Sequence, residues 1–140
     1  AEPLKQSRAF SVVAGALADE ATLALLLAAI ITWLAHSSLS IVLLVMSFAA
    51  AGLIPLPTAL AMVLGANLGG AIAPFLDQAG QTAKARRVPL GNVAMRAIAA
   101  LIALPFLSLA ARYLAQFEAE PARVVINFHT GFNLATALIF

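Results

Sequence analysis

The stretch that decides the fold is residues 21–76, which begins ATLALLLAAIITWLAHSSLSIVLLV at Ala21 and contains no Lys, Arg, Asp or Glu. A helix needs roughly 20 apolar residues to cross the hydrocarbon core of a bilayer. A charge-free window of 56 residues therefore predicts more than one membrane segment, or a segment that folds back. Shorter charge-free stretches follow at residues 97–111 and 124–140.

The overall composition also indicates a membrane environment. Hydrophobic residues make up 63% of the 140 residues and charged residues only 10%, whereas a soluble domain carries about 25% charged residues. Because so few charges cannot cover a water-facing surface, the composition predicts a chain embedded in a lipid bilayer. The net charge of +2 is small and scattered, which argues against a nucleic-acid partner, and the absence of cysteine excludes disulfides and thiol chemistry.

A polar cluster, His36-Ser37-Ser38-Leu39-Ser40, divides the first half of the charge-free window. The apolar run before it, residues 21–35, rises only about 22 Å as a helix, which is short of the roughly 30 Å hydrocarbon core. Another short apolar run, residues 41–51, follows the cluster. Residues 21–51 therefore predict a broken or re-entrant hairpin, and irregular backbone at membrane depth is tolerated only inside protein or beside a wet cavity.

A second set of helix-breaking residues follows the turn at residues 52–57, which contains two prolines. Within residues 58–76, the stretch Gly65-Ala66-Asn67-Leu68-Gly69-Gly70 places three glycines in six positions. This composition predicts an interrupted helix, although small residues also allow two helices to pack closely. Breaks in two apolar segments are typical of the sites where secondary transporters hold substrate and ions.

The remaining segments are predicted from their charges. Residues 77–89 form a basic loop with Lys84, Arg86 and Arg87, and such loops tend to remain cytoplasmic. We interpret these three residues as determinants of topology and not as ligands. The other predicted elements are an amphipathic leader or connector at 1–20, a membrane span at 93–115 with Arg96 near its start and a kink at Pro105, and a last helix at 124–140.

Several polar residues are candidates for ligand contacts. The hydroxyls of Ser37, Ser38 and Ser40 can donate to an anion or accept around a cation, and the amide oxygen of Asn67 can hold a cation. His36 is the one ionisable side chain in the charge-free window, and such a residue is a functional candidate in a membrane. The alternatives stay open, because these side chains also bond to their own backbone or join helices.

His129 and Asn133 lie four residues apart and therefore share one face of the last predicted helix. We favour hydrogen bonds between helices as their role. The acidic residues fall in flanks and loops, and two distant histidines without cysteine are weak as a metal site. No nucleophile–base pair is visible in the sequence, so we expect no enzyme activity and no metal centre. Apart from Glu2, the acidic residues are Asp19, Glu20, Asp77, Glu118 and Glu120.

These motifs resemble those of the sodium/phosphate cotransporter family, the type II kind found in bacteria and animals. That family has a Gln-Ser-Ser-Ser motif with a preceding Thr, then Gly-Ala-Asn-Ile-Gly-Thr-Thr, and later a His-Thr-Leu-Phe-Asn pattern. Here Thr32 precedes the cluster at 36–40, the second motif corresponds to residues 65–71, and the third to residues 129–134. The turn at 50–53 also looks similar, and the resemblance covers residues 23–140.

The sequence departs from the family motifs at several positions. His36 replaces the glutamine, Leu39 the third serine, and Gly70 and Ala71 the paired threonines. The resemblance carries over directly to Ser37, Ser38, Asn67 and Gly69, and to His36 by position only. It implies one of two inverted repeats, and a chain that opens without Met and stops in an apolar run at Phe140 is expected to be an excerpt.

Together, the residues and the resemblance predict an all-α, polytopic membrane protein with discontinuous or re-entrant helices, one half of an inverted-repeat transporter. The implied function is sodium-coupled secondary transport of inorganic phosphate across the cell (inner) membrane. Its partners would be phosphate, sodium as the coupling ion, the bilayer, and a second repeat of the same protein or another copy, with no cofactor. The alternative is a non-transporting membrane scaffold or regulatory subunit with a degenerate site. The candidate binding residues are Thr32, His36, Ser37, Ser38, Ser40, Asn67 and Gly69.

Overall fold

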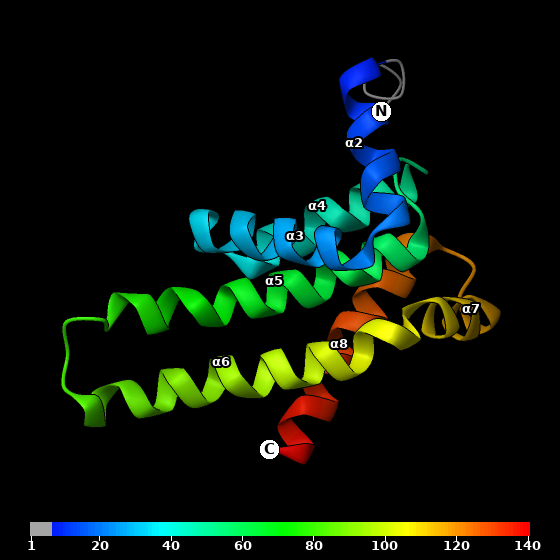
Figure 1. The fold of residues 1–140 in the computed structure, drawn as a ribbon. Helices are drawn as coiled ribbons and strands as arrows, with labels where there is room; N and C mark the ends of the chain where they lie inside the picture. The colour runs from blue at the N-terminus through cyan, green and yellow to red at the C-terminus, as the bar shows by residue number, and fades with distance from the viewer. Residues whose placement is uncertain (1–6) are drawn as a thin grey trace.

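The computed structural model describes residues 7–140, and every regular element in that range is helical, which confirms the all-α prediction. Figure 1 shows α5 and α6 as a long antiparallel pair joined at one end, with α3 and α4 on the outer side of α5 and α2 projecting away. The elements are α2 Arg8–Asp19, α3 Ala21–Ala35, α4 Ser38–Ala50, α5 Leu56–Asp77, α6 Ala83–Ala103, the 3-10 turn η1 Leu104–Phe106, α7 Leu107–Phe117 and α8 Pro121–Ile139.

The polar cluster separates α3 from α4. His36 adopts a left-handed conformation with φ of 52° and ends α3, which is unusual for a residue with a Cβ. Ser37 then caps α4, because its Oγ accepts a hydrogen bond from the backbone N–H of Ser40 at 3.3 Å. Both helices pack against α5, whereas the break between them is largely exposed.

The predicted interruption of the next helix is absent. α5 runs without a break from Leu56 to Asp77 and passes directly through the glycine cluster. The glycines instead allow α3 to approach closely, since a Cβ at Gly65 would overlap the carbonyl oxygen of Leu25 and one at Gly69 that of Ala29. Close packing, the alternative for this cluster, is therefore what the structure shows.

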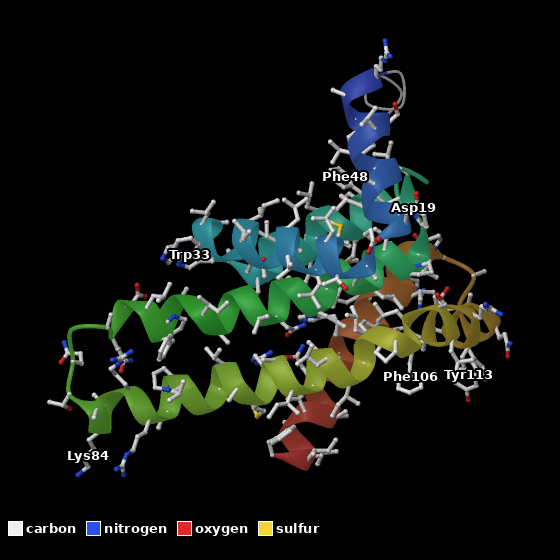
Figure 2. All side chains as sticks on the ribbon, viewed as in Figure 1. Asp19, Trp33, Phe48, Lys84, Phe106 and Tyr113 are labelled. Carbon is white, nitrogen blue, oxygen red and sulfur yellow. The ribbon has the colours of Figure 1, made fainter. Side chains whose placement is uncertain are left out.

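The basic loop predicted at 77–89 is mostly helix. α6 begins at Ala83, where Thr82 caps it by accepting a hydrogen bond from the N–H of Ala85 at 3.4 Å. The basic residues therefore lie on the first turns of α6, and Figure 2 shows Lys84 at the closed end of the hairpin. The connection between α5 and α6 contains only residues 78–82.

Two stretches of the described chain are long and apolar enough to cross a membrane: α5, and α6 through α7 at Ala83–Phe117. The second contains the predicted span at 93–115, starts earlier than expected, and changes to a 3-10 turn at Pro105. α2 and α3 together form a further candidate bent by 117°. Residues 1–6 of the predicted leader lie outside the described residues.

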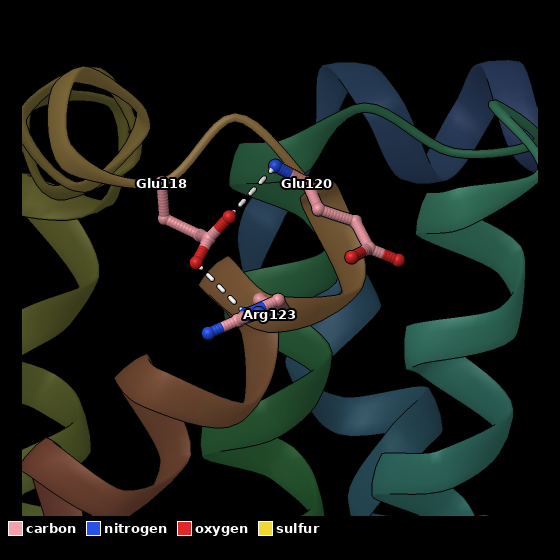
Figure 3. A network of polar contacts seen from close by, with 3 residues as sticks. All are labelled: Glu118, Glu120 and Arg123. Atoms are coloured by element: carbon pink, nitrogen blue, oxygen red, sulfur yellow. Dashed lines mark hydrogen bonds and ion pairs between the residues drawn. The ribbon is translucent and has the colours of Figure 1, made fainter.

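The connection between α7 and α8 is held by a small polar cluster (Figure 3). One carboxylate oxygen of Glu118 accepts from the backbone N–H of Glu120 at 3.2 Å, and the other pairs with Nε of Arg123 at 2.9 Å. Because Arg123 is largely exposed, the ion pair contributes at most about 1 kcal/mol. The bonds set the direction in which α8 returns to pack against α4 and α5.

The close approach of α3 and α5 gives a first prediction. Replacing Gly65 with Leu forces side-chain atoms into the backbone of α3, which should lower the stability of the full-length protein by about 3 kcal/mol. Thermal unfolding in detergent measures this effect. Gly15→Ala is the control, since no atom lies within 4 Å of the added carbon; equal shifts in melting temperature for the two variants would contradict the packing described.

Candidate functional site

A polar cavity of about 160 Å³ lies where α4, α5, α6 and α8 meet. The three consecutive helices α4, α5 and α6 contribute to it together with α8, and its lining is mainly polar. The lining residues are Ser38, Asn67, Gly70, Asn92, Arg96, His129 and Asn133.

Arg96 of α6 is the centre of this cavity. Its Nη1 donates to the amide oxygens of Asn67 at 2.7 Å and Asn133 at 2.9 Å. Its Nε donates to the amide oxygen of Asn92, one turn earlier on the same helix, at 3.1 Å. Three asparagine oxygens from three helices therefore fix the guanidinium in one orientation.

The same asparagines determine which nitrogen of His129 carries a proton. Because a guanidinium can only donate, the oxygens of Asn67 and Asn133 face Arg96 and their amide nitrogens face away from it. Those nitrogens lie 3.3 Å and 3.5 Å from Nδ1 of His129. Nδ1 is thus an acceptor, and the neutral ring carries its proton on Nε2 as a donor.

The cavity carries a positive charge without a protein counter-ion. Among residues 7–140, the ion pair of Arg123 with Glu118 is the one salt bridge present, and it lies outside the cavity. Arg96 is half-buried, and its bonds to asparagine use Nε and Nη1 only. Two N–H groups on Nη2 therefore remain for another acceptor, and an anion would make the stronger, charge-assisted bonds.

Ser38 and Gly70 also line this cavity. Ser38 is the first residue of α4, so the unpaired N–H groups and positive dipole end of that helix border the cavity. A Cβ at Gly70 would lie 3.2 Å from Cβ and 3.4 Å from Oγ of Ser38. The absent side chain at Gly70 therefore keeps space open beside the serine hydroxyl.

The predicted binding residues lie in three places: the cavity, the break between α3 and α4, and the contact of α3 with α5. Ser38 and Asn67 line the cavity. Ser37 and Ser40 bond to each other through their hydroxyl oxygens at 2.8 Å, in the cap of α4. His36 is exposed, with Nδ1 3.3 Å from the carbonyl oxygen of Leu34.

Thr32 and Gly69 lie in the contact between α3 and α5. A Cβ at Gly69 would collide with the Thr32 side chain as well as with the α3 backbone. Thr32 is fully buried, and its Oγ1 has no hydrogen-bond partner among the described residues. These two residues thus act in helix packing, with one buried hydroxyl left unused.

The sequence left open whether Asn67 holds a cation, and the geometry around it favours an anion instead. Its amide oxygen is engaged by the Arg96 guanidinium, and a second cation there would be repelled by the first. Arg96 was expected to lie near the start of the span at 93–115, and Asn92 was not singled out at all. The helix cap at Thr82 is the signal that would have placed both residues well inside α6. The hydrogen bonds between helices expected for His129 and Asn133 are present.

These observations define an all-α membrane protein with a buried polar centre suited to an anion. The chain belongs to the Na+/Pi-cotransporter family, whose model matches residues 4–136. No solved structure matches the chain.

Several curated bacterial proteins are similar to the chain. It is 36% identical over 137 residues to the "Putative inorganic phosphate export protein YjbB" of Escherichia coli (strain K12), which covers 98% of this chain and 25% of the relative. The Salmonella typhimurium protein of the same name is 35% identical over 136 residues. YqeW of Bacillus subtilis is 32% identical over 117 residues, which is 84% of this chain and 38% of the relative. The chain thus spans a quarter of the length of the E. coli protein.

Ser37 caps α4 and Ser38 lines the cavity, and measurements of protein stability can test these two assignments. Ser37→Ala removes the cap of α4 and should cost about 1 kcal/mol. Ser38→Ala removes a cavity hydroxyl for which the structure shows no protein partner and should change stability by less than about 0.5 kcal/mol. Thermal unfolding of the full-length variants measures both, and a larger loss for Ser38→Ala would reverse the two assignments.

Proposed function

We propose that this chain forms one of two inverted repeats in a membrane transporter for inorganic phosphate, and that the Arg96 cavity contacts the anion. The observation that carries the proposal is the guanidinium held by three neutral asparagine oxygens. These oxygens partly replace the water lost by the cation but leave its charge uncancelled. A phosphate ion supplies the missing negative charge.

The donors around the cavity suit a tetrahedral oxyanion. Nη2 of Arg96 offers two N–H groups, and Ser38 offers a hydroxyl at the N-terminal end of α4. Hydrogen bonds that involve a charged group contribute about 1.5–3 kcal/mol each. Because the asparagine bonds fix Arg96 before the anion arrives, little side-chain entropy is lost on binding.

Sodium is proposed as the coupling ion, held away from Arg96. Sodium requires oxygen ligands and is repelled by a guanidinium. The Oγ1 of Thr32 is a buried oxygen without a partner in the described chain, and the break that follows it in sequence frees backbone carbonyls. The family description supports sodium coupling; the printed name of the E. coli relative refers to export. We infer that the gradients across the membrane decide the direction of phosphate movement.

Transport requires a second wall for the cavity. In α6 and α7, only 11% of the most apolar window is buried, against 67% in α5. This exposed apolar surface suits lipid and a second repeat, supplied by the same protein or by another copy. Alternating access would then move the two halves around the cavity, in a multi-pass protein of the cell membrane.

The proposal predicts the effect of substitutions at Arg96. Arg96→Gln removes the charge and should lower sodium-driven flux of labelled phosphate in liposomes about tenfold or more. Arg96→Lys keeps a charge without the planar fork and should retain intermediate flux. Arg112→Gln is the matched control, because it removes one charge from α7 outside the cavity.

Two results would contradict the proposal. Full flux in Arg96→Gln would place the anion elsewhere. If the folded, inserted protein moves no phosphate with or without sodium, the scaffold or regulatory alternative replaces transport.

A further inference from the structure

The closed end of the α5–α6 hairpin contains a second hollow, separate from the Arg96 cavity. It has a volume of about 230 Å³ and shares no lining residue with that cavity. Its walls combine two guanidinium-bearing side chains with apolar ones. The lining residues are Phe75, Ala83, Arg86, Arg87 and Leu90.

Arg86 is held in this hollow but is incompletely bonded. Its guanidinium carbon lies 5.1 Å from the centre of the Phe75 ring, which is a cation–π contact. Its Nε is buried and has no hydrogen-bond partner among the described residues. Because a buried donor without an acceptor is unfavourable, the position calls for an acceptor from another molecule.

The charges around the hollow favour a negatively charged acceptor. Lys84, Arg86 and Arg87 lie close together on the first turns of α6, and no acidic residue occupies the first turn. The N-terminal end of a helix already carries a partial positive charge. None of the three forms a salt bridge within residues 7–140, so an anion at the hollow would relieve repulsion from both sources.

The position of the hairpin end indicates which kind of anion the hollow would bind. α5 has 22 residues and so rises about 33 Å, which matches the roughly 30 Å hydrocarbon core. Its end at Asp77 therefore lies at the membrane surface, among lipid headgroups. Val88 and Leu90, 81% and 52% exposed, lie on the α6 turns next to the charges and suit acyl chains.

We propose that this hollow binds an anionic phospholipid, with the phosphate on Arg86 and Arg87 and the glycerol and upper acyl chain against Phe75 and Leu90. Basic pockets between membrane helices bind acidic headgroups in this way. The basic character places the hollow on the cytoplasmic side. The apolar walls distinguish a lipid phosphate from free inorganic phosphate, which would gain nothing from them.

The test measures lipid selectivity directly and requires no transport. The full-length protein is placed in phosphatidylcholine nanodiscs that contain spin-labelled phosphatidylglycerol or spin-labelled phosphatidylcholine. Electron paramagnetic resonance gives the share of each label that is immobilised by the protein. We expect phosphatidylglycerol to be preferred, and Arg86→Gln to lower that preference by up to about fivefold.

Two further variants keep the test decisive. Arg87 is exposed, so Arg87→Gln should preserve the fold and also lower the preference. Arg112→Gln removes one charge from α7 and should leave the preference for phosphatidylglycerol unchanged. An unchanged preference in Arg86→Gln and Arg87→Gln, or an equal loss in Arg112→Gln, overturns the proposal. Loss of the preference in excess inorganic phosphate also overturns it, because the hollow would then be a site for the free anion.

Discussion

The close contact of α3 with α5 is the constraint on which the rest of the structure depends. Gly65 and Gly69 lie one above the other on α5 and let the backbone of α3 approach. Asn67 lies between them in sequence and, at 3.6 residues per turn, projects from the opposite face of the helix. Close packing on one side of α5 therefore directs Asn67 to the other side, where α6 and α8 complete the polar centre.

The polar centre is built to keep a charge available. A carboxylate beside Arg96 would neutralise it and compete with any anion, whereas amide oxygens stabilise the guanidinium and leave its charge in place. Asn67 and Asn133 also hold the His129 ring with its acceptor nitrogen inward. One set of residues thereby fixes both the guanidinium and the imidazole, and the bonds link α5, α6 and α8.

The sequence was sufficient for the fold class and for the break at His36, and two of its candidate residues, Ser38 and Asn67, line the polar cavity. It was not sufficient for the glycine cluster, since glycine is equally suited to a broken helix and to a close helix contact, and only the position of α3 distinguishes them. Arg96 was predicted near the start of a span because the charges of residues 84–87 favour a loop, whereas α6 already begins at Ala83. Which side chains of α6 and α8 meet Asn67 depends on helix packing that no local pattern encodes.

A structure of the full-length protein with bound phosphate tests the central claim most directly. The account predicts a tetrahedral anion within about 3 Å of Nη2 of Arg96 and of Oγ of Ser38, with the asparagine oxygens still on the guanidinium. A carboxylate from the remainder of the protein paired with Arg96, or phosphate bound at a distance from it, would contradict the account.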